Sequence, residues 1–362
     1  MESIVCANCQ QDDTAPCLEK WGFQIVQCRR CGLTYVNPRS VAEEVDDYFR
    51  GPYLSTIEEH GILNPGIQGI YAEILDRLHT LLVPGRLLDV GCAMGHFMVR
   101  AREHGWAVHG VESSRYAADY GRKRWDLRIQ ALSNLGDAHL PDNHFDACVL
   151  IEVAEHLGSP RATFEQVFQV LKPGGVLYLT TPNFGSYAAL FGREEWMAII
   201  PTGHLYYFTF ATISRMLTSV GFEEPVNLTP PAEFEVELER SRTTVSRALT
   251  DAGIESIRHR TFSEDRGLIV NGRGEGLVVC ARKPRSSSDA LVASLRFNGQ
   301  LPDFEGALIA SPSDGKVYLV KKSVRHWVTS VEWLHRHGMR LEDTIQVSAG
   351  QIQAMLEGPA LS

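Results

Sequence analysis

Short apolar runs and helix-like segments alternate through the middle of this sequence. The apolar runs have the length and composition of buried strands, and the segments between them carry apolar residues at helical spacing. The strand-like runs are 86–90, 107–111, 146–151 and 176–181, and the helix-like segments are 97–104, 114–125 and 161–171. Alternation of this kind predicts an α/β fold, with a parallel sheet covered by helices on both faces.

The composition agrees with a globular protein of more than one domain. The chain has 362 residues, of which 44% are hydrophobic and 22% are charged, and this argues against global disorder. No apolar run approaches the ~20 residues that a membrane span needs. The segment Met1–Gln10 lacks the features of a secretory signal, so we expect a cytoplasmic protein with no membrane partner.

Four of the eight cysteines form two C-x-x-C pairs. Cys6 and Cys9 make the first pair, and Cys28 and Cys31 make the second after 18 intervening residues. In a cytosolic chain this spacing predicts four thiolates around one tetrahedral zinc ion. Because sulfur fills all four positions, we expect a structural ion and not a catalytic one. The symmetric spacing disfavours the alternative of redox-active or incidental cysteines.

Changes in composition divide the chain into parts. The expected parts are a zinc ribbon over 1–38, a helical lead-in over 39–80, a main α/β domain over 81–284 with a helical insertion near 233–260, a linker over 285–290, and a small α+β module over 291–362. The linker is polar and lacks periodic apolar residues. The last module contains no recognisable chemical motif.

The first strand of the main domain ends in a glycine-rich loop. The loop follows Asp89 and runs from Gly91 to Gly95 in a G-x-x-x-G pattern. Glycines let the backbone approach a ligand closely, and the amides of the following helix start favour polar or anionic groups. The second strand ends at Glu112, 21 residues after Gly91, where a carboxylate can accept both hydroxyls of a ribose. These features predict a nucleoside cofactor but fit more than one cofactor class.

The other motifs of this domain resemble those of class I S-adenosylmethionine-dependent methyltransferases, over roughly residues 81–283. The family has a D-x-G-x-G-x-G loop, an acid that ends the second strand, F-D before the fourth strand and L-K-P-G-G before the fifth. The matching residues here are Asp89–Gly95, Glu112, Phe145–Asp146 and Leu171–Gly175. The sequence departs from the pattern at Ala93, where the family commonly has glycine. The resemblance implies a Rossmann-like sheet and S-adenosylmethionine as the cofactor.

The resemblance also assigns roles to residues. Gly91 and Gly95 border the methionine moiety, Glu112 holds the ribose, and the segment 132–137 flanks the adenine. The complete set of implied cofactor-binding residues is Asp89, Gly91, Cys92, Gly95, Glu112, Ser113, Leu132 and Ile151. The alternative is a Rossmann-like fold that has lost its cofactor, and the near-complete set of motifs argues against it.

The cysteine segment extends the resemblance. Residues 31–38 read C-G-L-T-Y-V-N-P. This is similar to the C-G-L-x-Y-x-x-P motif that follows the zinc-binding segment in a subset of these methyltransferases. Those enzymes act on sugars, antibiotics or other small metabolites, which implies a small-molecule acceptor for this chain.

A group of polar residues follows the fourth strand. Glu152, Glu155 and His156 form an E-x-x-E-H pattern, and their spacing predicts that all three side chains face one side of a helix start. The pattern resembles the metal-binding motif of ubiquinone-biosynthesis O-methyltransferases and of small-RNA 2′-O-methyltransferases, which implies His204 as a fourth ligand. One interpretation is therefore a Mg²⁺ or Mn²⁺ ion that activates an acceptor hydroxyl.

Two other interpretations of this group stay open. In one, no metal binds, and His156 or His204 acts as the general base toward a hydroxyl. In the other, the glutamates only position the cofactor loop. The catalytic candidates are accordingly His156, His204 and Glu152. Tyr206 and Tyr207 adjoin His204, and we expect them to line the acceptor pocket.

Together these observations favour an S-adenosylmethionine-dependent O-methyltransferase that acts on a small polyhydroxylated or glycosyl metabolite. The alternatives are an RNA methyltransferase, modifying a ribose 2′-hydroxyl or ribosomal RNA, and a non-enzymatic scaffold that keeps the cofactor fold. A net charge of −9 argues against a nucleic-acid partner. The sequence determines neither the acceptor nor the oligomeric state.

Overall fold

The computed structural model describes most of the first 285 residues and short segments of the remainder. The described residues are 1–40, 65–229, 234–244, 250, 254, 274–285, 308–310, 317–321, 324–328, 334, 345–346 and 356–361. They divide into two compact units, Met1–Lys283 and Pro284–Ser362. The predicted linker beyond Arg285, most of the helical insertion and residues 41–64 of the helical lead-in lie outside the described residues.

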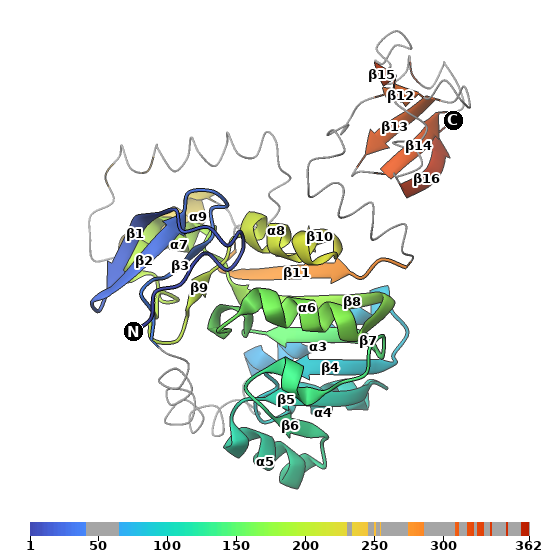
Figure 1. Cartoon of the computed structure of the whole chain (residues 1–362), viewed down its shortest axis with the longest axis horizontal. Helices are drawn as coiled ribbons and strands as arrows, with labels where there is room; N and C mark the ends of the chain where they lie inside the picture. The colour runs from blue at the N-terminus through green and yellow to red at the C-terminus, as the bar shows by residue number, and fades with distance from the viewer. Residues whose placement is uncertain are drawn as a thin grey trace. The chain divides into compact units, whose positions relative to one another are not determined.

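The first unit is built on a seven-stranded sheet with the order β10-β11-β8-β7-β4-β5-β6 (Figure 1). The strands are β4 (Arg86–Val90), β5 (Ala107–Glu112), β6 (Ile129–Ala131), β7 (Phe145–Ile151), β8 (Leu171–Pro182), β10 (Glu223–Asn227) and β11 (Gly276–Arg282). Strands β4 to β8 are mutually parallel, whereas β11 is antiparallel to its neighbours β8 and β10. The predicted Rossmann-like α/β fold is confirmed, with the correction that the sheet is mixed at the β11 edge.

Helices cover both faces of this sheet. On one face, α6 (Pro160–Val170) and α8 (Phe210–Val220) bury Phe164, Ile213 and Met216 in a core shared with β7 and β8. On the other face, α3 (Pro65–Leu81) and α4 (His96–Glu103) contribute to a second core. A third helix, α5 (Arg115–Trp125), packs near β6, and its first turn is capped by the Ser114 hydroxyl, which accepts a hydrogen bond from the Ala117 amide. The central strands are buried on both sides, as a parallel sheet requires.

The cysteine segment forms a smaller antiparallel sheet with the order β1-β2-β3-β9. The first three strands are β1 (Thr14–Lys20), β2 (Phe23–Cys28) and β3 (Thr34–Val36), and the fourth, β9 (Tyr206–Tyr207), lies about 170 residues further along the chain. The ribbon therefore shares a sheet with residues far along the sequence and lies within the first compact unit.

The second unit contains a five-stranded sheet with the order β15-β12-β13-β14-β16. Its strands are β12 (Leu308–Ala310), β13 (Val317–Lys321), β14 (Val324–Val328), β15 (Ile345–Gln346) and β16 (Leu356–Leu361). Outside these strands, the described part of the predicted α+β module includes one helical residue, Leu334. Among the helices that the structure describes, none has the length and apolarity to cross a membrane.

Candidate active site

The glycine loop leaves β4 along a path that requires left-handed backbone conformations. Gly91 has φ 73° and Gly95 has φ 81°, a region that favours glycine. A Cβ at Gly95 would also overlap the side chain of Leu127. Ala93 adopts φ 46°, which explains why glycine is common at this position in the resembling family.

A carboxylate from the next strand holds this loop in place. One carboxylate oxygen of Glu112 accepts a hydrogen bond from the Ala93 amide at 2.8 Å, and the other accepts one from the Ser114 amide at 2.7 Å. Loss of hydration raises the pKa of Glu112 even though these hydrogen bonds act in the opposite direction. Asp89 is also buried, and desolvation, followed by the charge of Glu112, raises its pKa to about 8. These two carboxyl groups lie at the carboxyl ends of β4 and β5, next to the loop.

All eight predicted cofactor residues lie at one edge of the sheet. Asp89, Gly91, Cys92 and Gly95 lie at the carboxyl end of β4, Glu112 and Ser113 lie at that of β5, Leu132 follows β6, and Ile151 ends β7. The amide of Leu132 donates a hydrogen bond to the carbonyl of Glu112 at 2.8 Å. This bond joins the segment expected to flank the adenine to the residue expected to hold the ribose. Ligands of open α/β sheets bind at this carboxyl edge.

The E-x-x-E-H segment follows β7 at the same edge. It forms a single 3₁₀ turn, Ala154–His156, and not the α-helical start that its spacing suggested. Glu152 precedes the turn with φ 54°, so the prediction that all three polar side chains share one helical face is wrong.

Three of the four predicted metal ligands nevertheless come together. One ligand atom each from Glu155, His156 and His204 lies within 4.8 Å of the others. The Glu155 carboxylate is 2% exposed, and its Oε2 accepts a hydrogen bond from the Thr181 hydroxyl at 2.7 Å. The two imidazole rings meet edge to face, with centroids 4.8 Å apart. Glu152 is not part of this three-residue group.

Backbone carbonyls fix the orientation of both histidines. The Nδ1 of His156 lies 2.9 Å from the carbonyl oxygen of Gly203, and the Nδ1 of His204 lies 2.8 Å from that of Ala198. A carbonyl can only accept, so each Nδ1 carries the proton, and each Nε2 keeps its lone pair. Burial lowers the pKa of both histidines to about 4, so both imidazoles are neutral at neutral pH.

The two glutamates have raised pKa values. Loss of hydration raises the pKa of Glu155 to about 7. The Glu152 side chain is exposed, yet enough protein surrounds it that desolvation, followed by the charge of Glu155, raises its pKa to about 7. Two neighbouring carboxyl groups with such values favour a shared proton or a bound cation.

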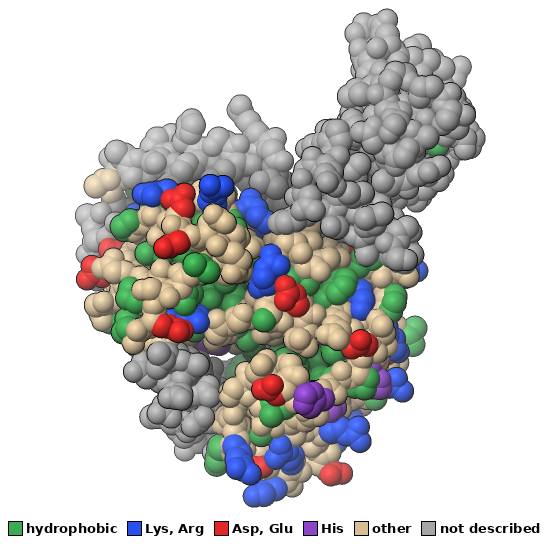
Figure 2. All heavy atoms as spheres, viewed as in Figure 1, with side chains coloured by type: hydrophobic (Ala, Val, Ile, Leu, Met, Phe, Trp, Pro, Cys, Tyr) green, Lys and Arg blue, Asp and Glu red, His purple; other side chains and the backbone are tan. Residues whose placement is uncertain are grey.

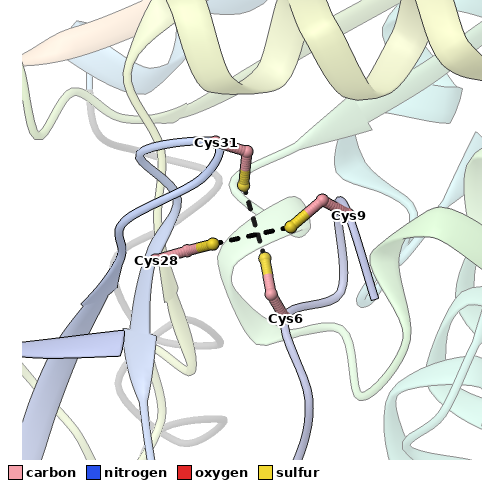
Figure 3. A group of neighbouring side chains, drawn as sticks. All are labelled: Cys6, Cys9, Cys28 and Cys31. Carbon is pink, nitrogen blue, oxygen red and sulfur yellow. Dashed lines mark hydrogen bonds between the residues drawn. The ribbon is translucent and has the colours of Figure 1, made fainter. Parts of the chain in front are cut away.

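The four paired cysteines point toward a common centre (Figure 3). The Sγ atoms of Cys6 and Cys31 are 3.4 Å apart, and those of Cys9 and Cys28 are 3.5 Å apart. Zinc–sulfur bonds of about 2.3 Å place tetrahedral sulfurs about 3.8 Å apart, and a disulfide requires about 2.05 Å. The donor set and spacing therefore fit a zinc ion, and all four thiols are free.

Several residues that support these sites were missed by the sequence analysis. Thr181 orients Glu155, Arg215 of α8 donates to the Cys31 carbonyl, and Arg161 of α6 donates to the Asn8 carbonyl at 3.2 Å. The two arginine contacts join positions more than 150 residues apart, so no local pattern could reveal them. Thr181 could have been noticed, because it ends the predicted strand 176–181 at the ligand-binding edge.

Tyr206 and Tyr207 do not form the expected wall of an acceptor pocket. Each is 2% exposed; Tyr206 belongs to the core that also contains Tyr35, and Tyr207 belongs to a core with Ile25 and Val36 of the ribbon strands. The Tyr206 hydroxyl accepts a hydrogen bond from Arg39 at 3.1 Å. Their aromatic character reflects the packing of β9 between the ribbon and the main domain.

Part of the chain is similar to known methyltransferases. Residues 66–224 match the family model described as a methyltransferase domain. A ubiquinone biosynthesis O-methyltransferase from Azoarcus sp. (strain BH72) is 28% identical over 156 residues, which are 40% of this chain and 67% of the relative. A malonyl-[acyl-carrier protein] O-methyltransferase from Serratia marcescens is 29% identical over 34% of this chain and 49% of its own length. The chain thus spans about half to two thirds of these curated relatives.

Solved structures of similar proteins include phosphoethanolamine N-methyltransferase 2 from Haemonchus contortus, in complex with S-adenosyl-L-methionine. It is 19% identical, with a TM-score of 0.49, and the match covers 69% of this chain and 62% of that one. The matched family and the curated relatives support an S-adenosylmethionine-dependent methyltransferase and leave its acceptor unspecified.

Proposed function

We propose that this protein is an S-adenosylmethionine-dependent O-methyltransferase whose acceptor is a small metabolite with adjacent hydroxyls, such as a glycosyl compound. The proposal assigns a divalent cation to Glu155, His156 and His204. The observation that carries it is the meeting of two neutral imidazoles, each with an Nε2 lone pair, and a buried carboxylate within 4.8 Å.

The cofactor assignment rests on the loop at the carboxyl edge of β4 and β5. Glu112 would accept hydrogen bonds from the ribose hydroxyls, and the backbone of Gly91–Gly95 would contact the methionine part of the cofactor. The buried Asp89 and Glu112 favour a cationic ligand, because its positive charge would stabilise their ionised forms. S-adenosylmethionine carries such a charge on its sulfonium and its amino group.

The donor chemistry favours Mn²⁺ over Mg²⁺. Magnesium prefers oxygen ligands, whereas manganese and later transition metals bind imidazole more readily. A pKa of about 4 makes His156 and His204 weak bases at neutral pH but leaves them available as ligands. The histidine-base alternative is therefore less well supported than the metal-ligand one.

The reaction requires few further groups. A bound cation would lower the pKa of an acceptor hydroxyl. The acceptor oxygen attacks the methyl carbon as the carbon–sulfur bond breaks, and S-adenosylhomocysteine leaves. Glu152, whose pKa is raised to about 7, would receive the hydroxyl proton in this proposal.

The RNA alternative receives less support. Basic and acidic side chains are interspersed over the described part of the face in Figure 2, and the whole chain carries a net charge of −9. An enzyme that binds a phosphate backbone needs a continuous basic surface. An acceptor of small size fits the charge better.

Methyl transfer to defined acceptors tests the proposal. The protein would be incubated with S-adenosylmethionine and a panel of small molecules that carry adjacent hydroxyls, catechol among them, and products would be weighed by mass spectrometry. We expect one acceptor to gain the mass of one CH₂ unit. This gain should require added Mn²⁺ and should be absent with the His204→Ala variant. Full turnover in excess chelator, with zinc still bound at the cysteines, would exclude the cation.

A further inference from the structure

We infer that the zinc-binding ribbon is a positioning element for the acceptor side of the active site, acting through β3 and the peptide of Leu205. The inference deepens the proposed function, because it rests on Glu155 and His204 acting there. It assigns the ribbon a role in the placement of two specific side chains, distinct from general support of the fold.

The first link runs from the cysteines to β9. Strand β3 begins three residues after Cys31, and it pairs with β9 so that Thr34 lies opposite Tyr207 and Tyr35 lies opposite Tyr206. The amide of Val36 donates to the carbonyl of Leu205 at 2.9 Å. Thus the ribbon bonds directly to the residue that follows His204.

The second link runs from Leu205 to the E-x-x-E-H turn. The amide of Leu205 donates to the backbone carbonyl of Glu155 at 2.8 Å. One peptide segment therefore joins the ribbon on one side to the 3₁₀ turn on the other. Glu155 accepts one of these two hydrogen bonds, and His204 directly precedes Leu205, which takes part in both. The two bonds therefore set the separation of the Glu155 and His204 side chains.

The third observation concerns how the ribbon itself is anchored. Cys6, Cys28 and Cys31 share one hydrophobic core with Tyr35 and Tyr206. Arg215 of α8 donates to the Cys31 carbonyl, and Arg161 of α6 donates to the Asn8 carbonyl. A zinc ion that fixes the four sulfurs would therefore fix the starting point of β3 against both helices.

The cofactor loop is held by a separate set of bonds. Gly91 and Ala93 are tied to β5 through Val111 and Glu112, and none of the hydrogen bonds identified in the described residues joins this loop to the ribbon. Loss of zinc should accordingly disturb the acceptor side and leave the strands under the cofactor intact.

Hydrogen–deuterium exchange on the full chain tests this without any acceptor. The comparison is between the zinc-loaded parent, Cys31→Ser, and Cys17→Ser, which changes a cysteine outside the quartet. In Cys31→Ser we expect exchange to rise roughly tenfold over residues 203–208 and 153–157, as for the loss of one hydrogen bond, and to stay unchanged over 86–91 and 107–112. Unchanged protection at 203–208, or equal loss at the cofactor strands, would overturn the inference.

A second variant leaves the cysteines in place. Arg215→Met removes the anchor on Cys31, Arg215→Lys restores a donor, and Arg29→Met is the control, since Arg29 pairs only with the exposed Asp13 among the described ion pairs. We expect Arg215→Met to bind Mn²⁺ several-fold more weakly, with S-adenosylmethionine affinity and zinc content unchanged, and Arg215→Lys to recover part of the loss. Equal Mn²⁺ affinity in Arg215→Met and Arg29→Met would contradict the positioning role. Absence of Mn²⁺ binding in the zinc-loaded parent would instead count against the proposed function, and the exchange result would still decide the ribbon's role.

Discussion

Glu112 has two tasks in this structure, one that is observed and one that is proposed. Its carboxylate accepts hydrogen bonds from the amides of Ala93 and Ser114, and we propose that it also holds the ribose of the cofactor. Because both tasks need the carboxylate oxygens, a change here should weaken cofactor binding directly and through the loop.

We predict that Glu112→Ala lowers S-adenosylmethionine affinity roughly tenfold to a hundredfold, as for the loss of one charged acceptor worth about 1.5–3 kcal/mol. Isothermal titration calorimetry measures the change. Glu103→Ala is the matched control, because Glu103 is an exposed carboxylate at the end of α4 that pairs with Arg100 and lies outside the predicted cofactor-binding set. Equal affinity in Glu112→Ala and the parent would remove the assignment.

In the proposed cation site, Glu155 would make binding depend on pH. Burial raises its pKa to about 7, so the carboxyl must lose a proton before it can ligate, whereas the histidines, with pKa values of about 4, are already neutral. Mn²⁺ affinity should therefore fall as the pH drops below about 7, by roughly tenfold between pH 8 and pH 6.

Titrations followed by the electron paramagnetic resonance of free Mn²⁺ test this prediction. Glu155→Gln should bind more weakly, and its pH dependence should flatten. An affinity in the parent that does not change from pH 6 to pH 8 would show that Glu155 is not a ligand.

At the scale of the strands, Asp146 joins the beginnings of β4 and β8. It accepts hydrogen bonds from the Arg86 amide at 2.8 Å and from the Lys172 ammonium at 2.6 Å. Burial acts to raise its pKa, but the hydrogen bonds from Lys172 and Arg86 outweigh burial and lower it. The F-D and L-K-P-G-G motifs thus have a structural reason, since they supply the two ends of one bridge.

Asp146→Asn should reduce the free energy of unfolding by about 1–2 kcal/mol at neutral pH, since its hydrogen bonds to charged or backbone groups are weakened. A lowered carboxyl pKa stabilises the fold above the unfolded value of 3.8, and this contribution is lost as the pH falls through the folded value. The difference between variant and parent in urea denaturation should therefore shrink near pH 3.5. The exposed Asp142→Asn is the control, and a difference that stays constant with pH would refute the bridge.

Some features of the strands and helices could be predicted from the sequence, and others could not. The strands and α-helices from Arg86 to Pro182 were all predicted except β6 (Ile129–Ala131), because their apolar spacing is local and each segment buries its own face. Strand β6 has only three residues, too few for a periodic signal, and β8 begins at Leu171, five residues before the predicted strand. The pairing of β3 with β9 could not be predicted, since it joins residues about 170 positions apart and β9 has only two residues. The left-handed conformation of Glu152 likewise leaves no periodic signal.

At the scale of the whole molecule, the first compact unit combines two sites that the sequence presents as separate. The sulfur quartet and the Glu155–His156–His204 group belong to one unit and are joined through Leu205, while the cofactor loop lies along the same sheet edge. In the inferred role, a ribbon without an open ligand position would act on the chemistry through the peptide of Leu205. The second unit, Pro284–Ser362, has its own sheet, and no function is assigned to it.

The most direct test of this account is anomalous diffraction from crystals grown with S-adenosylhomocysteine and Mn²⁺, recorded at the zinc and manganese absorption edges. The account predicts a zinc peak among Cys6, Cys9, Cys28 and Cys31, and a manganese peak bonded to Glu155, His156 and His204 beside the cofactor sulfur. An ordered cofactor with no manganese peak at these three side chains would contradict the central claim.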